Sequence, residues 1–191
     1  PRARSWPSEQ ENKGLILYQG AVNEGRCFEY LIPAMKTVPG ILHIYGDGNF
    51  MSQAKALVAA HHLEEKVFLM GRLKPADLSR ITPKARVGIP LFEPLGQSNY
   101  HSLANRFFDY VQAGVPQVCS DFPNYRSLNN EYQVALLVAP GIEAISAALN
   151  NLLENEVLYQ QMRSECMKAA RAWTWDNESG SLISLYKTLL P

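Results

Sequence analysis

The chain alternates short, continuously apolar runs with longer segments in which apolar residues recur every three or four positions. Continuous apolar runs are typical of strands buried on both faces, and the longer spacing is typical of amphipathic helices. Their alternation predicts parallel strands joined by crossover helices. The fold class expected is α/β, with a doubly wound, mainly parallel six-stranded Rossmann-like sheet and helices on both faces. The six strands are expected over 15–18, 41–45, 66–70, 87–91, 117–120 and 134–138.

Helical spacing is clearest in two of the connecting segments, Phe50 to His61 and Leu103 to Val111. After the last strand, no further strand pattern occurs, and the doubly wound unit is expected to end near Ala139. The remaining chain predicts a helical C-terminal tail. Its three helices are expected over 142–153, 157–172 and 177–190.

The first thirteen residues, PRARSWPSEQENK, are polar and charged and are twice broken by proline, at Pro1 and Pro7. This composition is typical of a linker. We expect residues 1–13 to be a linker or flexible N-terminal segment and residues 14–191 to form one domain. Because the chain begins with Pro1 rather than Met, we also expect it to be part of a longer protein.

Composition narrows the class of protein. With 191 residues, 47% of them hydrophobic, the chain can bury a substantial core, which excludes a disordered tail. Eighteen basic and eighteen acidic residues give a net charge of zero, so no nucleic-acid partner is expected. Three widely spaced cysteines fit packing thiols in a reducing compartment. No apolar run approaches the roughly 20 residues of a membrane span, and a cytoplasmic protein is expected.

Ligands of open α/β sheets bind beyond the carboxyl ends of the strands, so the segments that follow the strands carry the candidate chemistry. The loop after the first strand holds Gly20, a second glycine and Arg26. Glycines allow an anion to approach the backbone, a helix start presents free N–H groups, and a guanidinium can grip a phosphate with two hydrogen bonds. A tight turn with a solvated arginine fits the same residues.

The segment after the fourth strand, from Glu93 to Ser102, is a long polar loop that leads into a helix with Asn105, Arg106 and Asp109. Free N–H groups at a helix start suit an anion, and Asn, Ser and Gln side chains suit hydroxyls. Asp109 lies on the polar stripe of that helix, where its carboxylate can accept from two neighbouring ribose hydroxyls. A solvated helix face fits too, and His101 either belongs to the site or caps the helix.

The sequence gives little support for a dinucleotide, zinc, hydrolase or phosphate-loop site. The glycines of Gly46-Asp47-Gly48 match the start of a dinucleotide fingerprint, but Met51 replaces its third glycine and the motif follows the second strand, so a plain turn is the better interpretation. The four histidines lack zinc-site spacing, and neither a GxSxG elbow nor a Walker loop occurs. We therefore expect no metal. The main chain near Gly71 could pair with the edge of a flat ring.

Four motifs, in the order QGxxxxGR, LHIYGDG, KVFLMGRL and SNYHSLANRFFDYVQAGVPQVCSD, resemble the C-terminal domain of family-4 (group 1) retaining glycosyltransferases, which have the GT-B fold of two Rossmann-like domains. The resemblance runs from about Gly14 to Leu190. Its most specific part, Ser102 to Pro116, looks like the helix and turn that carry the second acid of the family's E-x7-E motif. On that match Asp109 takes the position of the acid that binds the donor ribose. Its side chain is shorter than that of the glutamate in the family motif. The first acid of the motif is replaced by His101, so the sugar preference is not inherited.

The resemblance implies that residues 14–191 bind a UDP-, GDP- or ADP-sugar and need no cofactor. Ala21 stands where the family has its first arginine, which leaves Arg26 as the remaining cation on the diphosphate and Arg106 as a candidate second one. By role, the implied residues are Gly20, Arg26, Ser102, Leu103 and Arg106 for the diphosphate, Asp109 for the ribose, Asn99, His101 and Ser102 for the sugar, and Met70, Gly71 and Arg72 for the base.

The implied function is that of the donor-binding half of a glycosyltransferase, which moves a hexose-type sugar to an acceptor glycan or lipid with retention. The implied location is the cytoplasm or the inner face of the membrane, with a role in polysaccharide biosynthesis. Acceptor-side catalytic groups are expected in an N-terminal domain of the same full-length protein, so this chain alone is expected to bind the donor without transferring sugar. Two alternatives stay open: a Rossmann-like interaction domain that has lost donor binding, and half of a GT-B-shaped sugar-nucleotide epimerase.

The helical tail contains Trp173 and Trp175, and this segment resembles the one that packs back across the junction of the two domains in the family. Packing of both tryptophans in the core of this chain fits equally.

Overall fold

The structure, a computed structural model, describes residues 14–189. At its centre is a six-stranded sheet in the order β3-β2-β1-β4-β5-β6, with every neighbouring pair of strands parallel. This confirms the predicted α/β Rossmann-like fold. The strands are β1 (Leu15–Gln19), β2 (Ile41–Tyr45), β3 (Val67–Gly71), β4 (Val87–Gly88), β5 (Gln117–Ser120) and β6 (Ala135–Val138).

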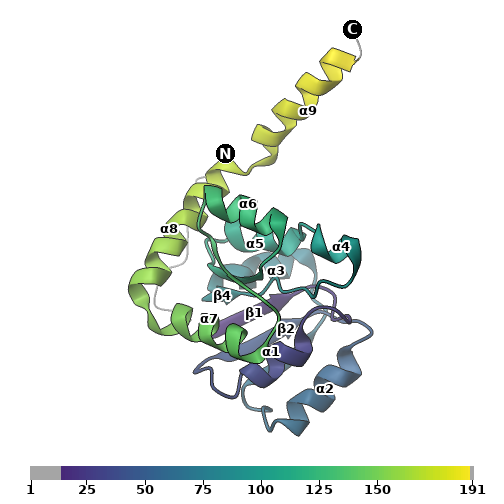
Figure 1. Ribbon diagram of the computed structural model, residues 1–191, viewed down its shortest axis with the longest axis vertical. Helices are drawn as coiled ribbons and strands as arrows, with labels where there is room; N and C mark the ends of the chain where they lie inside the picture. The colour runs from purple at the N-terminus through teal and green to yellow at the C-terminus, as the bar shows by residue number, and fades with distance from the viewer. Residues whose placement is uncertain (1–13, 190–191) are drawn as a thin grey trace.

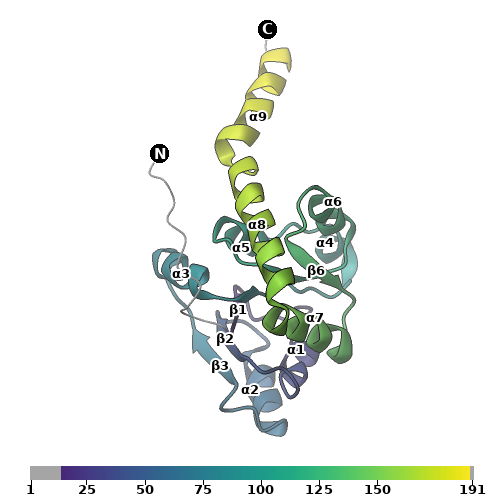
Figure 2. The ribbon, with the colours of Figure 1, turned by 90° about the vertical axis from the view of Figure 1, so that its left-hand side faces the viewer.

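Helices cover both faces of the sheet (Figures 1 and 2). Helices α1 (Phe28–Ala34), α2 (Met51–Ala60) and α7 (Ile142–Glu154) pack together on one face. On the other face α5 (Asn105–Gln112) packs against α8 (Glu156–Ala172) and the short helix η1 (Thr82–Lys84). The remaining helices are α3 (Pro75–Ile81), α4 (Gly96–Tyr100), α6 (Pro123–Glu131) and α9 (Trp175–Leu189).

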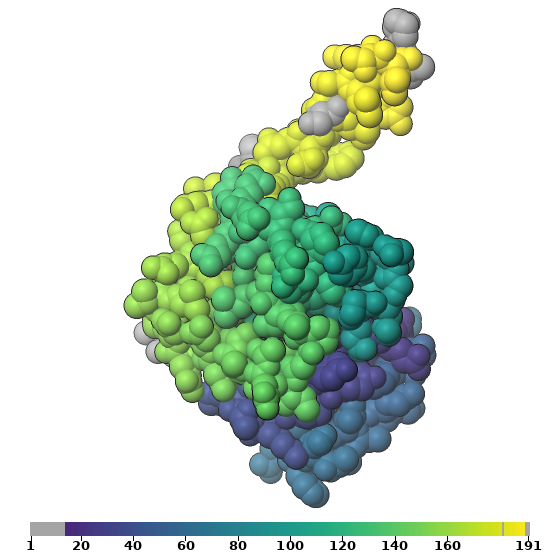
Figure 3. Space-filling model, viewed as in Figure 1, coloured from purple at the N-terminus to yellow at the C-terminus, as the bar shows by residue number. Residues whose placement is uncertain are grey.

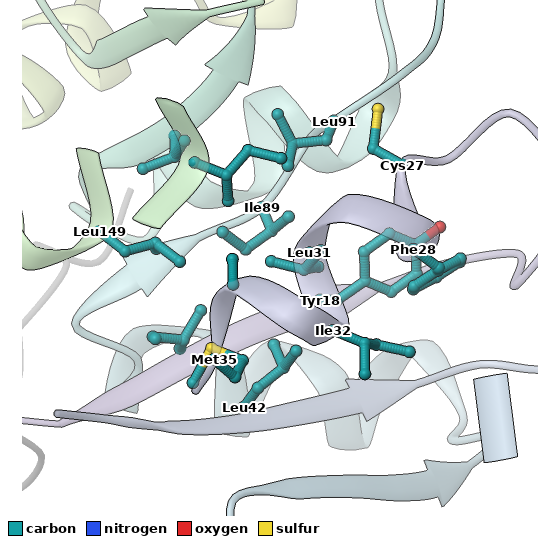
Figure 4. Packing of buried hydrophobic residues seen from close by; sticks show 14 of the residues in the cluster. Tyr18, Cys27, Phe28, Leu31, Ile32, Met35, Leu42, Ile89, Leu91 and Leu149 are labelled. Carbon is teal, nitrogen blue, oxygen red and sulfur yellow. The ribbon is translucent and has the colours of Figure 1, made fainter. Parts of the chain in front are cut away.

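Successive residues of β1 enter opposite sides of the core, which explains why the strand is apolar throughout. Ile16 and Tyr18 pack toward α1, whereas Leu17 packs on the other face of the sheet. Figure 4 shows Tyr18 beside Phe28 of α1, and their ring centroids are 4.7 Å apart. All three cysteines are buried, in agreement with packing thiols, and burial raises the pKa of the Cys27 thiol to about 12.

Several element boundaries differ from the prediction by one to three residues, and the differences in β4 and α5 have a clear structural cause. Strand β4 covers only Val87–Gly88 of the expected 87–91, because Pro90 has no N–H to donate to the sheet. The helix expected from Leu103 begins at Asn105, because the backbone of Ala104 is extended (φ −75°, ψ 136°). The expected polar loop before it also contains the short helix α4.

The three C-terminal helices are confirmed as α7, α8 and α9, and α9 projects away from the rest of the molecule (Figures 1 and 3). The two tryptophans of this region behave differently. The ring of Trp173 lies against Phe107, Phe108 and Tyr132, whereas Trp175 is 72% exposed. Core packing therefore describes Trp173 alone. The expected linker 1–13 and the last residue of the expected helix 177–190 lie outside the described residues.

Within residues 14–189, no helix combines the length and the apolar character that crossing a bilayer would require.

Arg86, which directly precedes β4, holds the junction of α7 and α8 by hydrogen bonds. Its side chain is 5% exposed and donates hydrogen bonds to the carbonyl oxygens of Leu152 (3.2 Å) and Leu153 (3.5 Å) and to a carboxylate oxygen of Glu156 (2.7 Å). The guanidinium carbon lies 3.7 Å from the ring centroid of Tyr159. This arrangement satisfies carbonyl groups at the end of α7 that the helix itself leaves free.

Replacing Arg86 by Met should lower the free energy of unfolding by about 2 kcal/mol, since buried carbonyls lose their donors and the ring loses its cation. Urea unfolding measures the change. Arg80→Met is the matched control, because the Arg80 side chain is 81% exposed; its effect should stay within about 0.5 kcal/mol. Equal stabilities of the two variants would show that Arg86 has no such role.

Candidate functional site

An open pocket of about 420 Å³ lies beyond the carboxyl end of β1, beside the segment that follows β4. In the order β3-β2-β1-β4-β5-β6, the direction of the connections reverses between β1 and β4, and ligands of open α/β sheets bind at that point. Six of the predicted site residues line the pocket, namely Gly20, Arg26, Asn99, Ser102, Arg106 and Asp109. The structure thus brings together residues that are up to 89 positions apart in the sequence, from Gly20 to Asp109.

Two guanidinium groups, those of Arg26 and Arg106, meet at this pocket. Each guanidinium carbon lies 4.5 Å from the ring centroid of Phe92. Within residues 14–189 neither guanidinium forms an ion pair with a carboxylate; Arg26 donates instead to the amide oxygen of Asn99 at 3.0 Å. Two positive charges without a counter-charge make the pocket suited to an anion.

Arg106 is the more buried of the two cations, with 8% of its surface exposed. Its Nη1 donates to the hydroxyl of Tyr18 at 2.8 Å and to the carbonyl of Gln19 at 3.4 Å. Its Nε is buried and has no hydrogen-bond partner among the described residues. A buried donor without an acceptor is costly, so the described residues satisfy the Arg106 guanidinium only in part.

The two cations affect each other. Burial and then the charge of Arg106 lower the pKa of the Arg26 guanidinium below its ordinary value. An arginine nevertheless keeps its charge at neutral pH, so the repulsion between the two guanidiniums persists. A bound anion would relieve it.

Glycines provide the space that the cations occupy. Gly20 has a φ of +131°, and a Cβ atom on it would lie 2.8 Å from Nη1 of Arg106. The segment that follows β2 fixes the position of Gly20. The N–H of Gly20 donates to the carbonyl of Tyr45 at 2.9 Å, and Gly46 packs directly on the carbonyl group of Gly20. The glycine in the predicted phosphate loop therefore permits the close approach of a guanidinium from α5.

Asp109 stands on the polar side of α5, as predicted, while Phe107 and Val111 of the same helix are fully buried. Its Oδ2 accepts a hydrogen bond from Nε2 of Gln19 at 3.1 Å. The surrounding protein removes enough water to raise the pKa of the Asp109 carboxyl above its ordinary value, and the bond from Gln19 partly opposes that increase.

This pKa direction predicts how stability depends on pH. Because the folded protein binds the Asp109 proton more tightly than the unfolded chain, the contribution of this carboxyl is fully present below its unfolded pKa of about 3.9 and is lost as the pH rises through the higher folded value. Asp109→Asn should therefore exceed the wild type in stability at pH 7 and match it near pH 3.5. Urea unfolding at both pH values tests this, and a variant less stable at pH 7 would contradict it.

Several predicted residues lie elsewhere. Leu103 precedes α5, is 44% exposed and lines a different groove, together with Trp173. His101 is exposed at the end of α4, where its carbonyl accepts from the side chain of Asn124, so it neither lines this pocket nor caps α5. The three base-binding candidates, Met70, Gly71 and Arg72, lie outside the pocket at the end of the edge strand β3, and Arg72 pairs with Asp47 at 3.5 Å.

Sequence reasoning missed Gln19, Phe92 and Thr82. Gln19 is a polar residue at the end of a continuously apolar strand, and this was the available signal. Phe92 supplies the ring between the two arginines, and Thr82 hydrogen-bonds to Gln19. No group of three or more His, Cys, Asp or Glu side chains suited to a metal ion occurs in the part of the chain that the structure describes.

Comparison with solved structures gives matches of low sequence identity. The catalytic domain of cholesterol-α-glucosyltransferase from Helicobacter pylori is 18% identical with a TM-score of 0.69, and the match covers 85% of this chain and 100% of that one. Sucrose-phosphate synthase from Thermosynechococcus elongatus is 19% identical with a TM-score of 0.78, over 92% of this chain and 45% of that one. HepE of Anabaena, in complex with UDP and glucose, is 14% identical with a TM-score of 0.75. The match covers 94% of this chain and 48% of that one.

At these identities the similarity establishes the fold, which is the Rossmann-like fold of GT-B glycosyltransferases. The chain spans less than half of the length of the latter two proteins. No curated protein matches the sequence. The family model described as "Glycosyl transferases group 1" matches residues 2–173, which is most of the chain. The chain therefore belongs to the group 1 glycosyl transferase family.

Proposed function

We propose that the chain is the donor-binding, C-terminal half of a family-4 retaining glycosyltransferase with two Rossmann-like domains. The observation that carries the proposal is the pair of guanidiniums, Arg26 and Arg106, that face one pocket without a carboxylate partner among the described residues. A nucleotide diphosphate supplies the missing negative charge. It also supplies oxygens that can accept hydrogen bonds from the guanidinium groups that line the pocket.

In this proposal both arginines donate to the diphosphate, close to the backbone of Gly20 and to Ser102. Arg106 provides the second cation that Ala21 cannot provide at its own position. As the bond between the sugar and the diphosphate breaks, negative charge grows on the leaving group, and two fixed guanidiniums stabilise that charge where it develops. They act without reorganising, because Phe92, Tyr18 and Asn99 already hold them.

The other parts of the donor are assigned from the family resemblance and, for the ribose and the sugar, from the residues that line the pocket. Asp109 accepts from the ribose hydroxyls, and Asn99 and Ser102, which line the pocket, lie nearest to the transferred hexose. The base extends toward the main chain around Gly71. We propose a UDP-, GDP- or ADP-sugar and no metal or cofactor. HepE was solved with UDP and glucose, which makes UDP the first nucleotide to test.

The acceptor, a glycan or lipid, and the acceptor-side groups belong to an N-terminal domain of the full-length protein in this proposal. The chain of 191 residues then binds the donor without transferring sugar. The proposed location is the cytoplasm or the inner face of the membrane.

Titration calorimetry of the 191-residue chain with UDP, GDP and ADP tests the proposal. One of the three should bind with a stoichiometry of one. If none binds, the chain is a Rossmann-like interaction domain that has lost its donor site. Product analysis on the full-length protein separates transfer from epimerisation, because an epimerase alters the sugar nucleotide in the absence of an acceptor.

The role of Asp109 gives a separate prediction. Asp109→Asn should weaken binding of the tightest nucleotide diphosphate about tenfold, because a charged acceptor of ribose hydroxyls is lost. Binding of the 2′,3′-dideoxy analogue, which has no hydroxyl to offer, should be unchanged. Calorimetry with both ligands measures the difference, and an equal loss for the two would show that Asp109 does not contact the ribose. The control is Asp176→Asn, an exposed position on α9.

A further inference from the structure

We infer that Gln19 is a positioning residue that fixes the Asp109 carboxylate in the orientation that receives the ribose hydroxyls, and that Thr82 fixes Gln19. The inference rests on the proposed nucleotide site and goes beyond it, since neither residue has a role in the proposal so far.

The three side chains form one continuous hydrogen-bonded chain from different elements. Gln19 ends β1 and is 5% exposed, and Thr82 begins η1 and is 3% exposed. The Thr82 hydroxyl lies 2.8 Å from Oε1 of Gln19, and Nε2 of Gln19 lies 3.1 Å from Oδ2 of Asp109. The buried end of the chain is therefore anchored in the fold, while the far end lies in the pocket.

The charge of Asp109 decides which way the Gln19 amide points. An ionised carboxylate can only accept hydrogen bonds, so the NH₂ group of Gln19 must face it and the amide oxygen must face Thr82. The reverse orientation would set the amide oxygen against a negative charge. Thr82 has one hydroxyl hydrogen, which Oε1 of Gln19 and the carbonyl oxygen of Leu78, both 2.8 Å from the hydroxyl oxygen, then share as acceptors. Both the oxygen and the nitrogen of the Gln19 amide therefore have hydrogen-bond partners.

This arrangement leaves a defined part of the carboxylate free. Gln19 occupies one side of Oδ2, so Oδ1 and the remaining lone pair of Oδ2 can accept from a ligand. Two neighbouring hydroxyls need a carboxylate whose plane is fixed, because a freely rotating group loses conformational entropy when it binds. The aspartate side chain on α5 is short, so the hydrogen bond from Gln19 is enough to fix the orientation of the Asp109 carboxylate.

The measurement compares a nucleotide with its hydroxyl-free form. We would use the tightest of UDP, GDP and ADP and its 2′,3′-dideoxy analogue, titrated into the 191-residue chain. Gln19→Met should weaken binding of the hydroxyl-bearing nucleotide about tenfold and leave binding of the analogue within about twofold. Thr82→Val, which retains the Gln19 side chain but removes the hydroxyl that fixes it, should show the same selective loss at about threefold.

The matched control is Gln117→Met. Gln117 is also fully buried and ends in a bond from its Nε2 to a carbonyl oxygen, but it lies on β5 and does not line the pocket. This variant reports the general effect of removing a buried amide, which should be equal for both nucleotides.

The outcomes separate the two claims. If the wild type binds none of the three nucleotides, the proposed function fails and this inference fails with it. If the wild type binds but Gln19→Met weakens both ligands equally, or neither, the inference alone is overturned. Circular dichroism checks the folding of each variant, and Thr82→Val decides the question by itself if Gln19→Met does not fold.

Discussion

Arg106→Met should weaken nucleotide diphosphate binding about 100-fold without lowering the melting temperature of the free protein. The loss of affinity follows from removing charge-assisted hydrogen bonds to phosphate oxygens. The stability follows from the surroundings of Arg106 within the protein, where the residue is 8% exposed, has an unpartnered Nε and pairs with no carboxylate among the described residues. Burying a charge in this way costs free energy that an apolar side chain of similar length does not incur.

The surroundings of Arg106 can accept a methionine. Its guanidinium lies over the rings of Tyr18 and Phe92, which offer good packing to a thioether. The hydroxyl of Tyr18 keeps its own acceptor, the carbonyl of Ala21, when the arginine is removed. A binding residue that destabilises the empty protein is expected at a functional site.

Calorimetric titration and differential scanning calorimetry measure the two quantities. Arg171→Met, at an exposed position on α8, is the control and should change neither. A melting temperature that falls by more than about 5 °C together with unchanged affinity would mean that Arg106 is a structural residue.

Gly46→Ala should lower the free energy of unfolding by about 3 kcal/mol or more and abolish nucleotide binding. Gly46 has a φ of +154°, and a Cβ atom on it would lie 1.8 Å from the carbonyl oxygen of Gly20. The oxygen belongs to the backbone and the backbone fixes the position of a Cβ atom, so no side-chain rotation relieves the overlap, and one loop must move. Movement of Gly20 disturbs the space beside it that Arg106 occupies.

Urea unfolding and nucleotide titration test this prediction. Gly141→Ala is the matched control, because a Cβ atom there has no heavy atom within 4 Å and the backbone is extended. Its stability should stay within about 0.5 kcal/mol of the wild type. If Gly46→Ala were equally stable, the contact between the two loops would not be what positions Gly20.

The central strands could be predicted because they are buried on both faces, so that Ile16, Leu17 and Tyr18 of β1 are all apolar even though they enter two separate clusters. The places where elements begin depend on single residues that the periodicity does not reveal. Pro90 shortens β4, and the extended backbone of Ala104 delays α5 until Asn105.

The site could be predicted in part because strand ends converge. Arg26 and Asp109 follow different strands, and a doubly wound sheet brings both segments to the edge where its order reverses. The partners of these residues could not be predicted. Whether Gln19 points at Asp109, or Phe92 lies between two arginines, depends on side-chain directions that appear only once the strands have their register.

Helix α9 shares little surface with the rest of the molecule beyond its first turn (Figure 3). Its exposed apolar side chains are Trp175, Leu182, Ile183, Leu185, Tyr186 and Leu189. A solitary helix of 15 residues is only marginally stable in water, because its internal hydrogen bonds barely offset the entropy of ordering the chain. The conformation of α9 in solution therefore depends on whatever surface shields these side chains, and deuterium should enter its amides far sooner than those of α8.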